Sequence, residues 1–207
     1  MDLTTWAAFM AASAALLAIP GPTVLLVLSY ALSQGRRVAL ASALGVGTGD
    51  LLAMSLSLAG LGALVLASAT LFTVLKWIGA AYLVWMGIGL WRAAGSARWT
   101  ETQAAPVPAR AVFRHAALVT ALNPKSIVFF IAFVPQFVDP GAALGPQFAI
   151  LTASFVGLAT VNAGLYALLA DRMRAGMRRP SVLRRITRAG GAALVAMGLA
   201  TALTRRA

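Results

Sequence analysis

The sequence predicts an all-α integral membrane protein with six transmembrane helices. Three observations lead to this fold class. Of 207 residues, 60% are hydrophobic and only 11% are charged, and the mean hydropathy is +0.86. A soluble domain usually has roughly 25% charged residues. The apolar residues gather in long runs that are separated by short basic stretches, which is typical of a helical bundle in a bilayer.

Six apolar segments are expected to form the spans. The N-terminus has an acid and no base before its apolar run, which favours a retained first helix over a cleaved signal peptide. Most segments reach the roughly 20 residues that cross a hydrocarbon core, and the last is the shortest. The segments run from about 5 to 30, 38 to 66, 70 to 91, 116 to 138, 147 to 170 and 189 to 203.

Basic residues orient this bundle. The net charge of +12 does not indicate nucleic-acid binding, because the arginines lie in short loops, where they meet anionic lipid headgroups. By the positive-inside rule, the loops after the first, third and fifth segments are expected to be cytoplasmic. The basic residues of these loops are Arg36, Arg37, Arg92, Arg98, Arg110, Arg114, Arg172, Arg174, Arg178, Arg179, Arg184, Arg185 and Arg188.

The longest polar stretch divides the chain into two halves. Residues 1–93 are expected to form a first three-helix repeat and residues 116–207 a second, joined by a cytoplasmic linker at 94–115 within a single transmembrane domain. An odd number of spans in each half places the halves in opposite orientations, which is the geometry of an inverted repeat.

The first span of each half carries a matched helix breaker, Pro20-Gly21-Pro22 in one and Asn123-Pro124-Lys125 in the other. Proline removes a backbone donor, and the freed polar groups cannot face lipid. Discontinuous helices at corresponding places indicate the substrate site of a transporter. The alternative interpretation is that each proline is only a packing kink. Thr23 follows the first breaker and belongs to the same candidate site.

Two ionisable side chains are expected deep in the membrane. Asp50 lies about twelve residues into the second segment, roughly 18 Å from its cytoplasmic end. A charged acid at that depth costs at least about 2.5 kcal/mol, so it should face the interior, find a partner or stay protonated. Lys125 is either that partner or a side chain that snorkels to the interface. A structural ion pair remains an alternative role for Asp50.

The fifth segment has a second polar face, formed by Asn162 and Tyr166. These side chains either bind a polar ligand or join helices to one another. Gly45 and Gly49 fit a close helix–helix contact. The chain has no cysteine and one histidine, His115, so a thiolate or multi-histidine metal site is excluded. A phosphate-binding loop and an acidic pair for hydrolysis are also missing, so neither an enzyme nor a cofactor is expected.

Four motifs occur in order along the chain: PGPT at 20–23, GVGTGD at 45–50, LKWIGAAYLVWMGIGLWRAAG at 75–95, and NPKSIVFF at 123–130 followed by PQF at 135–137. Together they resemble the lysine exporter (LysE/RhtB) family over nearly the whole chain, and most closely its homoserine and threonine exporter branch. The resemblance implies a small amino-acid exporter of the bacterial inner membrane, driven by proton antiport, and it allows a homodimer.

These observations give a hypothesis for the site. Amides near the breaks and Lys125 would receive a substrate carboxylate, while freed carbonyls and Asp50 would receive its ammonium group. Asp50 could also exchange a proton in each cycle. A channel for small polar solutes, a structural membrane protein and an exporter of another solute or a divalent cation remain alternatives.

Overall fold

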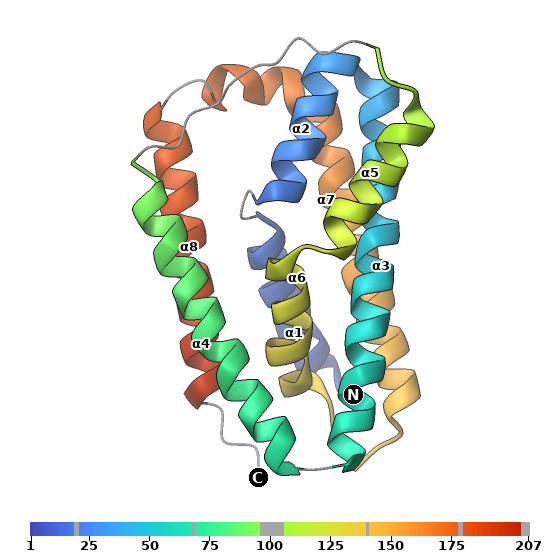
Figure 1. Ribbon diagram of the computed structural model, residues 1–207, viewed down its shortest axis with the longest axis vertical. Helices are drawn as coiled ribbons and strands as arrows, with labels where there is room; N and C mark the ends of the chain where they lie inside the picture. The colour runs from blue at the N-terminus through green and yellow to red at the C-terminus, as the bar shows by residue number, and fades with distance from the viewer. Residues whose placement is uncertain (19–20, 68, 96–105, 140, 178–179, 204–207) are drawn as a thin grey trace.

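The computed structural model describes residues 1–18, 21–67, 69–95, 106–139, 141–177 and 180–203, which are mostly helical and contain no strand (Figure 1). Two helical stretches, Arg36–Gly60 and Leu144–Ala170, are each long and apolar enough to cross a membrane. If each of two bent helix pairs also counts as one span, the described residues contain up to four candidate spans.

The helices follow one another in the same order in both halves of the chain. The first half contains α1 (Leu3–Ala18), α2 (Pro22–Gln34), α3 (Arg36–Ala67) and α4 (Ala69–Ala93). The second half contains α5 (Ala109–Ala121), α6 (Pro124–Val128), the π-helical turn η1 (Phe129–Phe133), the 3-10 turn η2 (Val134–Phe137), α7 (Leu144–Met177) and α8 (Pro180–Leu203).

Each half therefore begins with two helices that meet at an angle. The bend is 54° between Leu3–Ala18 and Thr23–Gln34, and 42° between Ala109–Ala121 and Pro124–Phe137. We call the junction between Ala18 and Pro22 the first break and the junction between Ala121 and Pro124 the second break. In both, the following helix starts at a proline, which lacks the N–H that a first helical residue leaves unbonded anyway.

Local chemistry sets two further helix ends, the start of α1 and the end of α2. Asp2 caps α1, because its Oδ1 accepts a 2.8 Å hydrogen bond from the Thr5 N–H and its Oδ2 one of 2.8 Å from the Thr5 hydroxyl. The hydrogen bond from the Thr5 N–H lowers the pKa of Asp2. At the other end of the first bent pair, Gly35 has a φ of +82°, which lets the chain turn sharply from α2 into α3.

Several helices are longer than the apolar runs predicted. The helix before the second break begins at Ala109 rather than near 116, so the expected linker at 94–115 is partly helical. Likewise α7 continues to Met177 rather than 170, and α8 begins at Pro180 rather than near 189. The physical reason is that hydropathy marks the part of a helix suited to lipid, while backbone hydrogen bonding continues through arginine-rich turns.

Glycines bring the long helices together. A Cβ at Gly45 would meet the Phe113 carbonyl of α5, and one at Gly47 would meet the Thr160 hydroxyl of α7. The predicted close contact at Gly45 and Gly49 is thus confirmed, and α5 is the helix on the other side. The pair α4 and α8 lies side by side (Figure 1) and meets backbone to backbone at Gly87 and Gly191.

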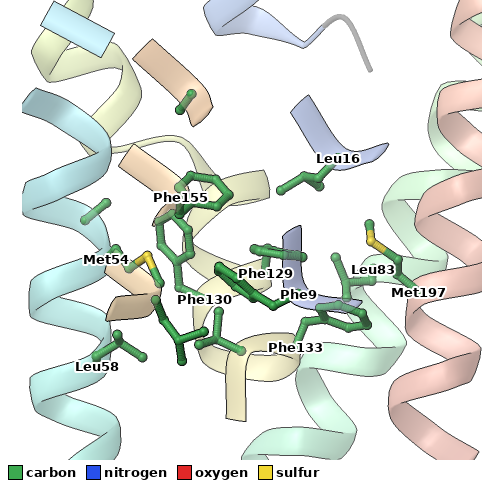
Figure 2. Packing of buried hydrophobic residues seen from close by; sticks show 14 of the residues in the cluster. Phe9, Leu16, Met54, Leu58, Leu83, Phe129, Phe130, Phe133, Phe155 and Met197 are labelled. Carbon is green, nitrogen blue, oxygen red and sulfur yellow. The ribbon is translucent and has the colours of Figure 1, made fainter. Parts of the chain in front are cut away.

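Two apolar clusters fill the interior, one on each side of the breaks. The aromatic cluster joins α1, η1 and α7 (Figure 2); its buried rings are those of Phe9, Phe129, Phe130, Phe133 and Phe155. The small-residue cluster joins α2, α3, α5 and α7; its members are Val24, Val27, Leu28, Ala31, Ala39, Ala43, Val46, Ala116, Ala163, Ala167 and Ala170.

The π-helical turn explains how so many rings are buried together. Four of its five residues are buried, all except Ile131. Phe129 stacks on Phe133 with ring centroids 5.1 Å apart, and Phe130 meets Phe155 edge to face at 4.9 Å. Pro135 follows in η2 and cannot donate a backbone hydrogen bond. The wider π-helical turn before it fits this missing bond, because the regular α-helical pattern is interrupted there.

Candidate functional site

The carboxyl end of α1, at the first break, is bonded by three side chains from the second half of the chain. Lys125 Nζ donates to the Leu16 carbonyl at 3.2 Å, Asn162 Nδ2 to the Leu17 carbonyl at 3.2 Å, and Tyr166 OH to the Ala18 carbonyl at 3.4 Å. We call these three consecutive carbonyls the α1 carbonyl end. The last carbonyls of a helix lack partners within it and carry a partial negative charge.

The polar groups of the second break are hydrogen-bonded mainly by residues close to it in the sequence. Asn123 caps α6, since its Oδ1 accepts a 3.1 Å hydrogen bond from the Lys125 N–H. The Leu122 N–H donates to the Leu118 carbonyl at 3.0 Å, and the Asn123 N–H donates to the Thr120 carbonyl at 3.0 Å. Because these groups are satisfied locally, the second break is a preformed structure.

The two breaks touch each other. Asn123 Nδ2 lies 3.2 Å from the Thr23 hydroxyl, to which it donates a hydrogen bond. Gly21 leaves space for the lysine, since a Cβ at this position would lie 3.3 Å from Lys125 Nζ. The glycine of the first break and the lysine beside the second are therefore complementary in shape.

Asp50 lies in the bundle interior with 2% of its surface exposed. Its Oδ1 has no hydrogen-bond partner within the described part of the chain. Asp50 lies on α3 and Lys125 on α6, and these two helices pack against each other. The neighbouring Gly49 holds the helix against α5, since a Cβ there would lie 2.7 Å from the Thr120 Cβ. The structure thus gathers one acid, one base and a helix end in an apolar bundle.

The structure places the predicted site residues in different roles. Lys125 is only 7% exposed and bonds to α1, so the alternative of a lysine that snorkels to the interface is wrong. Asn162 and Tyr166 join α7 to α1, which is the helix-joining alternative. Pro22 and Pro124 begin α2 and α6, and Pro20 lies outside the described residues.

Freed carbonyls at the breaks were expected as partners for a substrate's ammonium group, and in the structure side chains of the protein itself bond to them. The carbonyls concerned, those of Leu16, Leu17 and Ala18, could not be identified from the sequence, because the apolar side chains of these residues carry no such signal. A second unpredicted link joins α2 to α5, where the Tyr30 hydroxyl lies 2.8 Å from His115 Nδ1. Each of these contacts joins residues that are far apart in the sequence.

Comparison with known proteins decides the family. The model of the LysE type translocator family matches residues 14–205. The chain belongs to this family. The family of the chain is therefore one of translocators and not of enzymes, and the expected resemblance to lysine exporters is confirmed.

Several proteins are similar in sequence to this chain. The chain is 35% identical to an uncharacterized membrane protein of Vibrio cholerae over 99% of this chain and 100% of that protein. It is 35% identical to the homoserine/homoserine lactone efflux protein of Salmonella typhimurium over 100% of both. It is 34% identical to the leucine efflux protein of Klebsiella pneumoniae over 64% of this chain and 63% of that protein. No solved structure matches the chain significantly.

Proposed function

We propose that this LysE-family protein exports small amino acids of the homoserine and threonine type across the bacterial inner membrane by proton antiport. The observation that carries the proposal is the contact between the two helix breaks at the buried Lys125, with the buried Asp50 on the helix that packs against α6. Support for the substrate class comes from the full-length similarity to a homoserine/homoserine lactone efflux protein. The shorter similarity to a leucine efflux protein makes leucine the second substrate to test.

The chemistry of the site suits an amino acid. A zwitterion needs a cationic partner for its carboxylate and a carbonyl or carboxylate partner for its ammonium group. Lys125 and the N–H groups that begin α2 would supply the first, and the α1 carbonyl end with Asp50 would supply the second. Thr23, Asn123, Asn162 and Tyr166 would contact the substrate's remaining polar groups or hold the breaks open for it.

Asp50 is the proposed proton carrier. A carboxyl group whose Oδ1 is buried and has no hydrogen bond to any described residue is poorly stabilised as an anion, so an exchange of proton for substrate ammonium would keep the site's charge balanced. Inward proton movement would then drive outward movement of the amino acid.

We further propose six spans arranged as two inverted repeats, with the loops between the first and second, third and fourth, and fifth and sixth spans in the cytoplasm. Packing of α3 on α7 and of α4 on α8 supports the repeat, because these are corresponding helices of the two halves. In this orientation the aromatic cluster would close the outer side of the site, and the small-residue cluster would lie on the cytoplasmic side.

The proposal is tested by uptake of a labelled amino-acid panel into inverted vesicles, with and without an imposed pH gradient. We expect gradient-driven accumulation of homoserine or threonine in wild-type vesicles and its loss in Asp50→Asn vesicles with equal protein content. Uptake that survives in Asp50→Asn keeps the exporter and removes Asp50 as the proton carrier. Saturable movement without any gradient dependence would favour the channel, and no movement of any amino acid would overturn the proposal.

A further inference from the structure

The lysine beside the second break occupies a place suited to a substrate's ammonium group. Lys125 Nζ is itself a primary ammonium group, and it lies 3.2 Å from the Leu16 carbonyl in the interior of the bundle. The two other donors on the α1 carbonyl end, Asn162 and Tyr166, are neutral. Among the described residues, Lys125 is thus the donor that brings a full positive charge to the partial negative charge of this helix end.

We propose that Lys125 is an internal substitute for the substrate, which a zwitterion displaces by exchange. This inference rests on the proposed function and deepens it. The substrate's ammonium group takes the position of Lys125 Nζ on the α1 carbonyl end. The displaced Lys125 then pairs with the substrate's own carboxylate. Before the exchange, Lys125 is bonded to the α1 carbonyl end and water solvates the two charged groups of the substrate. After it, the α1 carbonyl end is bonded to the substrate's ammonium group and Lys125 to its carboxylate.

The surroundings of Lys125 permit this movement. Gly21 presents no side chain to it, and the atoms nearest to a Cβ at Gly21 are Nζ, Cε and Cδ of Lys125, at 3.3, 3.6 and 3.9 Å. The Lys125 side chain thus lies directly against the backbone of the first break, where a substrate carboxylate would meet the first N–H groups of α2. Asp50 Oδ1, buried and without a hydrogen bond among the described residues, is a further acceptor for an arriving ammonium group.

Exchange has a consequence for specificity. An amine without a carboxylate displaces Lys125 from the α1 carbonyl end but gives the lysine no anion in return. A carboxylic acid without an amine attracts Lys125 but leaves the α1 carbonyl end one donor short. Both therefore leave a buried group unsatisfied, which is costly. The site should select molecules that carry both groups.

The test measures binding to purified protein in detergent by displacement of a labelled amino acid. The probes are homoserine, 3-aminopropanol, which lacks the carboxylate, and 4-hydroxybutanoate, which lacks the amine; for a leucine-binding protein they are leucine, 3-methylbutylamine and 4-methylpentanoate. In Lys125→Met we expect the amine to bind about tenfold more tightly and the amino acid about tenfold more weakly, the size expected of one charged hydrogen bond. Gly157→Ala, at a position where an added Cβ meets none of the described atoms within 4 Å, should leave the ratio of the two affinities unchanged.

A second measurement uses the wild-type protein and needs no variant. If the amine and the acid act in exchange, adding 4-hydroxybutanoate should raise the apparent affinity for 3-aminopropanol several-fold, and the reverse should hold equally. Equal weakening of amine and amino acid in Lys125→Met, an equal shift in Gly157→Ala, or independent binding of the two half-substrates would overturn the exchange while leaving amino-acid export intact. Wild-type protein that binds no amino acid would overturn both proposals.

Discussion

The two helix breaks look alike in sequence but are stabilised differently. At the second break, Asn123 caps the helix that follows it and nearby carbonyls accept the remaining N–H groups. At the first break, Gly21 has no capping side chain, and the preceding carbonyls depend on donors that lie more than one hundred residues away. Among the described residues, the second break is thus held mainly by local hydrogen bonds, and the first mainly by tertiary ones.

This difference indicates which break takes part in binding. A locally satisfied turn gains little from a ligand, because its polar groups already have partners. Long-range donors such as Lys125 can be replaced by a ligand without unfolding the helix that they cap. The first break is therefore the better candidate for the surface that meets the substrate, and the second break is the support that carries Lys125 to it.

The largest expected effect comes from removing that lysine. Lys125→Ala should lower gradient-driven uptake by about 100-fold, because it removes the proposed partner of the substrate carboxylate, and a buried charge pair that loses one member typically costs about 2–5 kcal/mol. Uptake into vesicles with matched protein content measures it, with circular dichroism as the control for folding. A variant that folds normally and transports at the full rate would remove Lys125 from the site.

A smaller effect is expected at Gly21, where the first break meets the lysine. In Gly21→Ala the new Cβ would lie 3.3 Å from Lys125 Nζ and would push it from the Leu16 carbonyl. We expect apparent affinity for the amino acid to change by about three- to tenfold, the range of a mild overpacking. Gly157→Ala is the matched control, since a Cβ at Gly157 meets nothing within 4 Å. Equal effects of both substitutions would contradict a specific role for Gly21.

The local character of the second break can be tested through stability. Asn123→Ala should lower the free energy of unfolding by about 1 kcal/mol, the usual value of a helix cap. Thermal unfolding followed by circular dichroism measures the change. Asn123→Asp keeps an oxygen for the Lys125 N–H but loses the donor to Thr23, so it separates the local cap from the contact between breaks. If Asn123→Asp were as unstable as Asn123→Ala, the long-range contact would dominate.

The smallest effects are expected from the two neutral side chains that bond to the α1 carbonyl end. Asn162→Leu should cost about 0.6 kcal/mol of stability, the average for a hydrogen bond between membrane helices. Tyr166→Phe should cost less, because its hydrogen bond to the Ala18 carbonyl is longer, at 3.4 Å. A double-mutant cycle sharpens the comparison, since caps of the same helix end should not be additive. Full additivity would indicate that the two side chains act independently.

Much of the architecture could be predicted from local sequence signals. Apolar runs indicated the long helices, and Pro22 and Pro124 indicated where two of them begin. The helix ends were predicted less well, because arginine-rich turns at 109 to 115 and 180 to 188 remain helical although they are polar. The burial of Asp50 followed from the cost of placing an acid in lipid, and this expectation is confirmed at 2% exposure.

The sequence by itself determined the helical composition, the position of the breaks and the presence of Asp50 and Lys125 within apolar segments. Only the tertiary structure decided what these groups contact. The Leu16, Leu17 and Ala18 carbonyls belong to every peptide alike, so nothing in their side chains could reveal them as the acceptors for Lys125, Asn162 and Tyr166. Their role arises because a broken helix leaves its last carbonyls unbonded, and the fold brings three donors to them.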